Sequence, residues 1–127
     1  VYHGLLSIPE LSKLYWSSSI GLIPYLLTPY TLGVNPLKTF EYLAAGLGVV
    51  STAVPAVHPI HGHVEVISEV ADLSRAISNV RGADSDRIAS VRLATAMEHS
   101  WSNRGQEARA LVSKTVEAVA GRSLPSA

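Results

Sequence analysis

The chain has 127 residues, which suits one domain or part of one, and 47% of them are apolar. Only 16% are charged and ten basic residues balance ten acidic ones, so the composition excludes a disordered chain and gives no general attraction for nucleic acid. The lack of cysteine excludes a disulfide framework and thiolate metal sites, and it is consistent with a cytoplasmic protein.

The first segment predicts the end of a strand followed by a helix. Residues 1–3 have the pattern of a strand end. Ser7 then has the place of a helix N-cap, with Pro9 in the first turn and Glu10 as the capping-box partner of Ser7. Apolar residues at helical spacing follow, and the serines at 17–19 end this helix.

The second segment predicts a strand, a loop and a short helix. The apolar run at 20–25 is typical of a strand that is buried on both faces, and residues 26–34 are predicted to form a loop. A helix is predicted over 36–45, with Asn35 as its N-cap, a proline at its first helical position and Gly46 just after its last turn.

The remaining chain predicts two strands and three helices. In order, they are a strand at 48–52, a proline- and histidine-rich loop at 54–62, a strand at 63–67, and helices at 71–80, 85–99 and 101–120. Buried strands that alternate with helices indicate a parallel sheet, so the predicted fold is a Rossmann-like α/β sheet with flanking helices that ends in two consecutive helices.

The predicted domain is incomplete. A doubly wound domain usually has about five or six strands, and this chain supplies only three or four. The chain also starts without Met, in the middle of a pattern. We therefore expect a partial domain over residues 1–120, followed by a disordered tail at 121–127. No signal peptide or apolar run of about 18 residues is present, so no membrane span is predicted.

The helix at 36–45 carries two charges that a packing helix does not need. In open parallel sheets, ligands bind beyond the carboxyl ends of the strands, where helix N-termini offer free N–H groups and a partial positive charge. Lys38 adds a full charge there, so Lys38 and the Leu37 amide could hold a diphosphate. Glu41 lies one turn further along the same face, where it could accept hydrogen bonds from the two vicinal hydroxyls of a ribose.

A second interpretation needs no ligand. Lys38 and Glu41 could form an exposed i,i+3 ion pair worth a few tenths of a kcal/mol. The residues alone leave the two interpretations equally open. In both of them, Leu37, Phe40 and Ala44 are expected on the opposite face, packed on the sheet.

The stretch NPLKTFEYLAAGLGVVST, residues 35–52, resembles the donor-binding signature of GT-B glycosyltransferases of the large group-1 (family 4-like) class. The shared positions are Pro36, Lys38, 41–46 and 49–52. Residues 4–15 and the His-Ser-Trp-Ser-Asn-Arg segment at 99–104 are also similar to segments of this class. The resemblance covers nearly the whole chain, and it implies the second half of the C-terminal, donor-binding domain of a GT-B enzyme.

The resemblance also implies a site and a reaction. Glu41 would bind the donor's ribose, and the start of its helix would face the diphosphate or the donor sugar, with the base near residues 4–6. The implied donor-binding residues are Tyr25, Val34, Asn35, Pro36, Leu37, Lys38 and Glu41. The full enzyme would move a sugar from a UDP- or GDP-sugar to a sugar, glycan or lipid acceptor, with retention and without a metal or other cofactor.

The resemblance further implies a place and partners for the enzyme. These are bacterial-type cell-surface polysaccharide synthesis, a cytoplasmic location, and peripheral association with the inner face of the membrane. No catalytic residue is expected in this chain. The acceptor-binding N-terminal domain and the first βα units lie outside it, so we expect the fragment to be inactive alone.

Two positions depart from the signature of the class. Gly33 stands where the class has a first glutamate, and Leu47 with Gly48 replaces a Lys-Pro pair. Two alternatives stay open, a GT-B nucleotide-sugar epimerase and a non-catalytic nucleotide-binding or scaffold domain. The departures favour the second of these.

The histidines and tryptophans are weaker candidates for functional residues than Lys38 and Glu41. His58, His61 and His63 lack a carboxylate or fourth ligand at a diagnostic spacing, so no metal site is predicted, although one of them could line the cleft. Trp101 is expected to anchor a core, and Trp16 is expected to pack against its surroundings.

Overall fold

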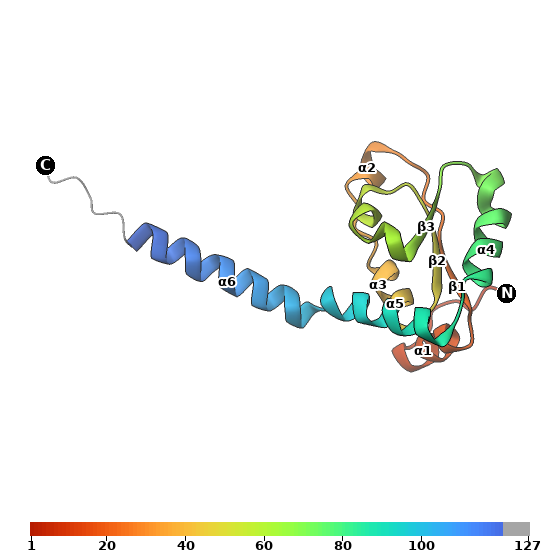
Figure 1. Ribbon diagram of the computed structural model, residues 1–127, viewed down its shortest axis with the longest axis horizontal. Coiled ribbons are helices and arrows are strands. Elements are labelled where there is room, and N and C mark those ends of the chain that lie inside the picture. Colours follow the sequence, from red (N-terminus) through yellow and green to blue (C-terminus); the bar gives the residue numbers. More distant parts are fainter. Residues whose placement is uncertain (121–127) are drawn as a thin grey trace, which may run out of the picture. The chain divides into compact units, whose positions relative to one another are not determined.

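The computed structural model describes residues 1–120, except for the side chains of His58, Pro59 and His61. The tail predicted at 121–127 lies outside the described residues. The chain divides into two compact units, Val1–Ala96 and a second that begins at Met97. Figure 1 draws both units.

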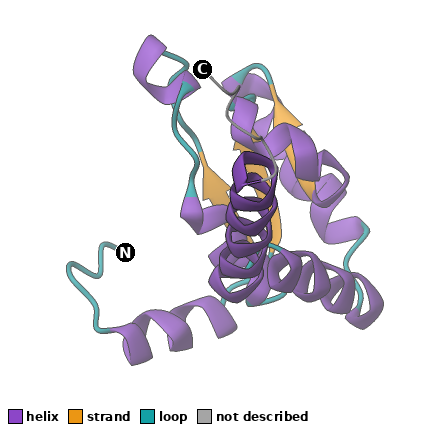
Figure 2. Cartoon of the chain, turned by 90° about the vertical axis from the view of Figure 1, so that its left-hand side faces the viewer, coloured by secondary structure: helices purple, strands orange, loops and turns teal. Residues whose placement is uncertain are grey.

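A three-stranded parallel sheet forms the centre of the first unit. Its strands are β1 (Ile20–Ile23), β2 (Gly48–Thr52) and β3 (Val64–Ile67), in the order β1-β2-β3. Gly21 lies opposite Val49, and Val50 lies opposite Glu65. Figure 2 shows the strands with helices around them. The predicted α/β fold, a Rossmann-like partial domain, is confirmed.

Helices cover both faces of this sheet, as Figure 1 shows. Helix α3 (Leu37–Ala44) and the 3₁₀ segment η1 (Pro55–His63) pack on one face, and α4 (Leu73–Gly82) packs on the other. Neighbouring residues of β2 point to opposite faces. Val49 therefore joins a core with Leu43 of α3, while Val50 joins a second core with Ala76 of α4.

The described chain has other helical segments besides α3, η1 and α4. They are α1 (Ile8–Trp16), the short α2 (Pro29–Leu32), the 3₁₀ turn η2 (Val70–Asp72), α5 (Asp86–Glu98) and α6 (Trp101–Ala120). The capping box predicted for α1 is present, because Ser7 and Glu10 bond reciprocally. Within residues 1–120, no helix is both long and apolar enough to cross a membrane.

A tight turn joins α3 to β2 and fixes where α3 ends. Gly46 has φ +77°, a left-handed conformation that favours glycine. Its N–H donates to the Leu43 carbonyl at 2.9 Å, and the Leu47 N–H donates to the Tyr42 carbonyl at 3.0 Å. This pair of bonds is a Schellman motif, so the predicted glycine stop is confirmed.

Several local predictions are wrong. Residues 1–3 belong to no strand, because these exposed residues pair with no described segment. The run at 20–25 is strand only to Ile23, and Leu22 is 41% exposed, because β1 lies at an edge of the described sheet. The predicted loop at 26–34 contains α2, whose first turn is capped by Thr28.

The remaining differences lie in the second half of the chain. The predicted loop at 54–62 is largely the 3₁₀ segment η1, kinked at Ile60. The strand predicted from residue 63 begins one residue later, and the helix predicted over 71–80 is a 3₁₀ turn followed by α4.

Neither tryptophan is buried. Trp16 is 80% exposed on α1 and Trp101 is 77% exposed on α6, which corrects the expectation that both would pack. The cores of the first unit are filled by smaller aliphatic side chains, and neither α1 nor α6 buries any residue.

Candidate functional site

The candidate site begins at the first turn of α3, which starts one residue later than predicted. Pro36 is the N-cap and not the first helical residue, because its backbone is extended, with φ −74° and ψ 101°. Its carbonyl accepts from the Thr39 N–H at 3.0 Å. The prediction of Asn35 as N-cap is therefore wrong, and within the described residues no side chain caps this turn.

The buried face of α3 differs from the predicted one. Thr39 and Leu43, four residues apart, are almost fully buried, whereas Leu37 and Ala44 are exposed. Leu37 precedes Thr39 by two positions and Ala44 follows Leu43 by one, so at about 100° per residue both side chains are turned away from the Thr39–Leu43 stripe. Phe40 packs against the core beside Leu43, as expected.

Lys38 and Glu41 lie side by side on the exposed side of α3, as their spacing predicts. Lys38 Nζ is 3.5 Å from Glu41 Oε2, and their side chains are 56% and 44% exposed. The ion pair of the ligand-free interpretation is thus present. Because both groups are largely in water, the pair contributes little to stability, and a ligand can displace it at small cost.

A third residue, Tyr15 of α1, completes this group. Its hydroxyl donates to Glu41 Oε2 at 2.9 Å, and Lys38 Nζ donates to the Tyr15 hydroxyl oxygen at 3.4 Å. We call these three residues the Tyr15–Lys38–Glu41 cluster. Sequence reasoning did not assign Tyr15 a role, because 26 residues separate it from Glu41. The one available signal was its place in the segment at 4–15 that resembles the glycosyltransferase class.

The surroundings of the cluster raise the pKa of two of its groups, both of which are protonated at neutral pH. Burial and the hydrogen bond to Glu41 raise the pKa of Tyr15. Burial lowers the pKa of Lys38, but the hydrogen bond with Tyr15 and the charge of Glu41 outweigh that effect, so the pKa is raised overall. Tyr15 is therefore a neutral donor here, and Lys38 is a cation.

Glu41 also borders a groove between α1 and α3. The groove has a volume of about 400 Å³ and combines the Tyr15 and Glu41 side chains with a mostly apolar wall. That wall consists of Ile8, Leu11, Ser12, Trp16, Ala44 and Ala45. A carboxylate beside an apolar groove can bind a ligand that carries hydroxyls next to a flat or apolar group.

The other predicted donor-binding residues lie nearby in sequence but outside the cluster. Tyr25 is 37% exposed and its carbonyl accepts from Thr52 Oγ1 at 2.8 Å, which ties the end of β1 to the end of β2. Val34 is half-buried and Asn35 is exposed. Among the described contacts, none joins the side chains of these three residues to the cluster.

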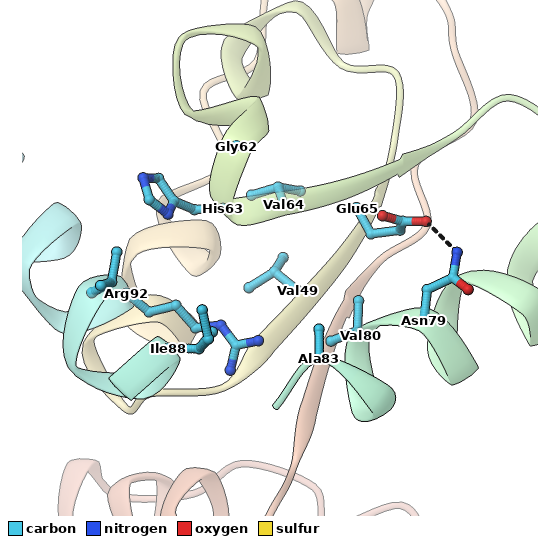
Figure 3. A pocket seen from close by; sticks show the side chains of 11 residues that line it. Val49, Gly62, His63, Val64, Glu65, Asn79, Val80, Ala83, Ile88 and Arg92 are labelled. Atoms are coloured by element: carbon cyan, nitrogen blue, oxygen red, sulfur yellow. Dashed lines mark hydrogen bonds between the residues drawn. The ribbon is translucent and has the colours of Figure 1, made fainter. Parts of the chain in front are cut away.

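A second cavity of about 380 Å³ lies by β2, β3, α4 and α5 (Figure 3). The buried Arg92 side chain lines it, and its Nη1 donates to the Gly46 carbonyl at 3.0 Å and to Asp84 Oδ1 at 2.7 Å. At its rim, Asn79 donates to Glu65 at 3.1 Å. Arg92 thus links α5 to the turn that follows α3, which is a structural role.

The described residues offer no cluster of metal ligands. No three side chains of His, Cys, Asp or Glu gather to hold an ion in the part of the chain that the structure describes. The side chains of His58 and His61 lie outside that part, and His63 lines the Arg92 cavity.

Comparison with known proteins gives one partial similarity. The chain is 54% identical over 37 residues to the "Putative teichuronic acid biosynthesis glycosyltransferase TuaH" of Bacillus subtilis (strain 168). The match spans 29% of this chain and 9% of that protein. No family model and no solved structure matches the chain. The similarity supports a glycosyltransferase-like role and extends no further than that.

Proposed function

We propose that this chain is the donor-binding part of a GT-B glycosyltransferase of the group-1 class. The observation that carries the proposal is the Lys38–Glu41 pair on the exposed side of α3, next to an uncapped first turn and a groove. The proposed donor is a UDP- or GDP-sugar, and the proposed acceptor is a sugar, glycan or lipid that an N-terminal domain of the same protein would bind.

The proposed chemistry assigns a separate task to each charged group. Lys38 and the first-turn amides of α3 stabilise the departing diphosphate, so no metal is needed for that step. Glu41 accepts hydrogen bonds from the ribose and fixes the donor's position without transferring a proton. Groups that act directly on the sugar would lie outside this chain, and we propose that the sugar's anomeric configuration is retained.

The substitution Glu41→Ala tests this proposal. We expect it to raise the Kd for UDP or GDP by at least about tenfold in the protein that contains this chain, because roughly 1.5–3 kcal/mol depends on charged hydrogen bonds. Isothermal titration calorimetry measures the change. In the full enzyme, the KM of the donor sugar should rise by a similar factor.

Glu65→Ala is the matched control for this experiment. Glu65 is a partly buried carboxylate of β3 that bonds to Asn79 by the Arg92 cavity, and it has no contact with the cluster. Its removal should leave nucleotide affinity unchanged. If wild type and Glu41→Ala bound UDP or GDP with equal affinity, Glu41 would not be part of the donor site.

A non-catalytic scaffold is the second candidate function. It is favoured by the ion pair itself, which already gives Lys38 and Glu41 a partner, and by Gly33 in place of an acidic residue. Calorimetry distinguishes the two candidates, since a scaffold need not bind UDP or GDP at all. For a binding-competent protein, product analysis separates glycoside formation from epimerisation of the donor sugar.

A further inference from the structure

We propose that Tyr15 is a positioning residue of the donor site, which orients the Glu41 carboxylate for the ribose. This inference rests on the proposed function. Tyr15 approaches Glu41 from another helix, α1, and its hydroxyl makes the shortest polar contact of the cluster. Its task is to hold Glu41 in one orientation before the donor arrives.

Both protein contacts of the Glu41 carboxylate fall on the same oxygen. Tyr15 donates to Oε2 at 2.9 Å, and Lys38 Nζ lies 3.5 Å from the same atom. Among the described residues, no side chain or backbone group bonds Oε1. An exposed glutamate has several rotamers, and fixing Oε2 removes most of that freedom. Oε1 then remains available to a ribose hydroxyl.

The Tyr15 ring is held in place independently of its hydroxyl. It packs edge-on against Tyr42, with ring centroids 5.3 Å apart and an interplanar angle of 82°. Tyr42 in turn lies over Gly21 of β1, where any larger residue would collide with its ring. A chain of contacts thus runs from the sheet through two aromatic rings to the phenol and then to Glu41.

A bound nucleoside diphosphate would affect the two donors to Glu41 differently. Lys38 is a cation, so a bound diphosphate competes with Glu41 for it. Tyr15 is neutral, so a bound diphosphate attracts its hydroxyl less strongly than it attracts the Lys38 cation. When Lys38 moves to the anion, Tyr15 therefore keeps Glu41 oriented. The separation of tasks lets one cluster serve both the diphosphate and the ribose.

The experiment compares ribose with deoxyribose ligands. Calorimetric titrations of the protein that contains this chain use UDP and GDP, each beside its 2′-deoxy counterpart. A site that bonds a ligand hydroxyl rejects an analogue that lacks it, so wild type should prefer the ribose form by about tenfold or more. In Tyr15→Phe, which keeps the ring pair with Tyr42, that preference should fall to about threefold or less.

Tyr42→Phe is the matched control, because it removes a phenol hydroxyl from the same ring pair. The Tyr42 hydroxyl makes no described hydrogen bond, so the ribose preference should remain as in wild type. Circular dichroism of each variant verifies that the helices are intact.

An unchanged ribose preference in Tyr15→Phe would overturn the inference while the proposed function stands. If that unchanged preference came with an equal loss of affinity for both forms, Tyr15 would have a purely structural role. A wild type that binds neither UDP nor GDP would overturn the proposed function and this inference with it.

Discussion

Gly48, at the start of β2, stands where a side chain has no room. A Cβ placed there would collide with Cγ1 of Val80 on α4. Val80 is β-branched and sits in a helix, so it has little rotamer freedom with which to move away. Close packing of α4 on β2 therefore depends on this glycine, which departs from the Lys-Pro pair of the glycosyltransferase signature.

Gly48→Ala should consequently destabilise the chain by about 1–3 kcal/mol, the usual cost of overpacking. Urea unfolding followed by circular dichroism measures the free energy of unfolding. Gly33→Ala is the control, because Gly33 has φ −95° and its nearest neighbour for a Cβ is the Tyr30 carbonyl oxygen at 3.6 Å. That variant should stay within about 0.5 kcal/mol of wild type. Equal effects at the two glycines would contradict the packing account.

At the scale of residues, the sequence predicts side-chain contacts within one helix better than contacts between two helices. The 3.6-residue period placed Lys38 and Glu41 together correctly. The buried stripe of α3 was misplaced, because a helix with apolar residues at 37, 40, 43 and 44 allows more than one packed face. Tyr15 could not be predicted, because its contact depends on how α1 lies against α3.

Among the elements, α1 depends strongly on its own local bonds. It buries no residue, so packing contributes little to holding it. Its first turn is held by the Ser7–Glu10 capping box, and Tyr15 bonds to α3 near its other end. Because Tyr15 is at that end, the order of α1 affects the candidate site directly.

The capping box makes the start of α1 sensitive to acid. The Ser7 hydroxyl and the Ser7 N–H donate to Glu10, and these bonds lower the pKa of Glu10 below its usual 4.5. A carboxylate with a depressed pKa stabilises the fold above its unfolded pKa, and this contribution is lost as pH falls through the folded value. The Cα chemical shifts of Ile8–Trp16 should therefore become less helical in that acidic range.

Glu10→Gln separates this effect from the titration of other acids. The glutamine side chain does not ionise, so the variant should lack the part of the pH dependence that Glu10 causes. An identical acid response of wild type and variant would show that the capping box does not set the stability of α1.

Elements with strong local signals were predicted well. The α1 capping box and the α3 glycine stop have side-chain or conformational signatures, and both were found. The helix α2 and the 3₁₀ segment η1 were missed, because proline-rich turns of four to nine residues lack a hydrophobic period. The exposure of β1 was also missed, since a strand's place in a sheet depends on which other strands pair with it.

For the molecule as a whole, two cavities of similar size have different linings. The groove with Glu41 lies between α1 and α3, and α3 packs on one face of the sheet. The other cavity holds Arg92, which is already bonded to Gly46 and Asp84. Composition and periodicity predicted the α/β class, but only the arrangement of the helices shows which side chains border each cavity.

Hydrogen–deuterium exchange with and without UDP or GDP, in the presence of EDTA, tests the central claim most directly. The account predicts that a nucleotide slows exchange of backbone amides at residues 33–41, the approach to α3 and its first turns. Slower exchange around Arg92 and His63, with residues 33–41 unaffected, would contradict it, as would the absence of any nucleotide-dependent change.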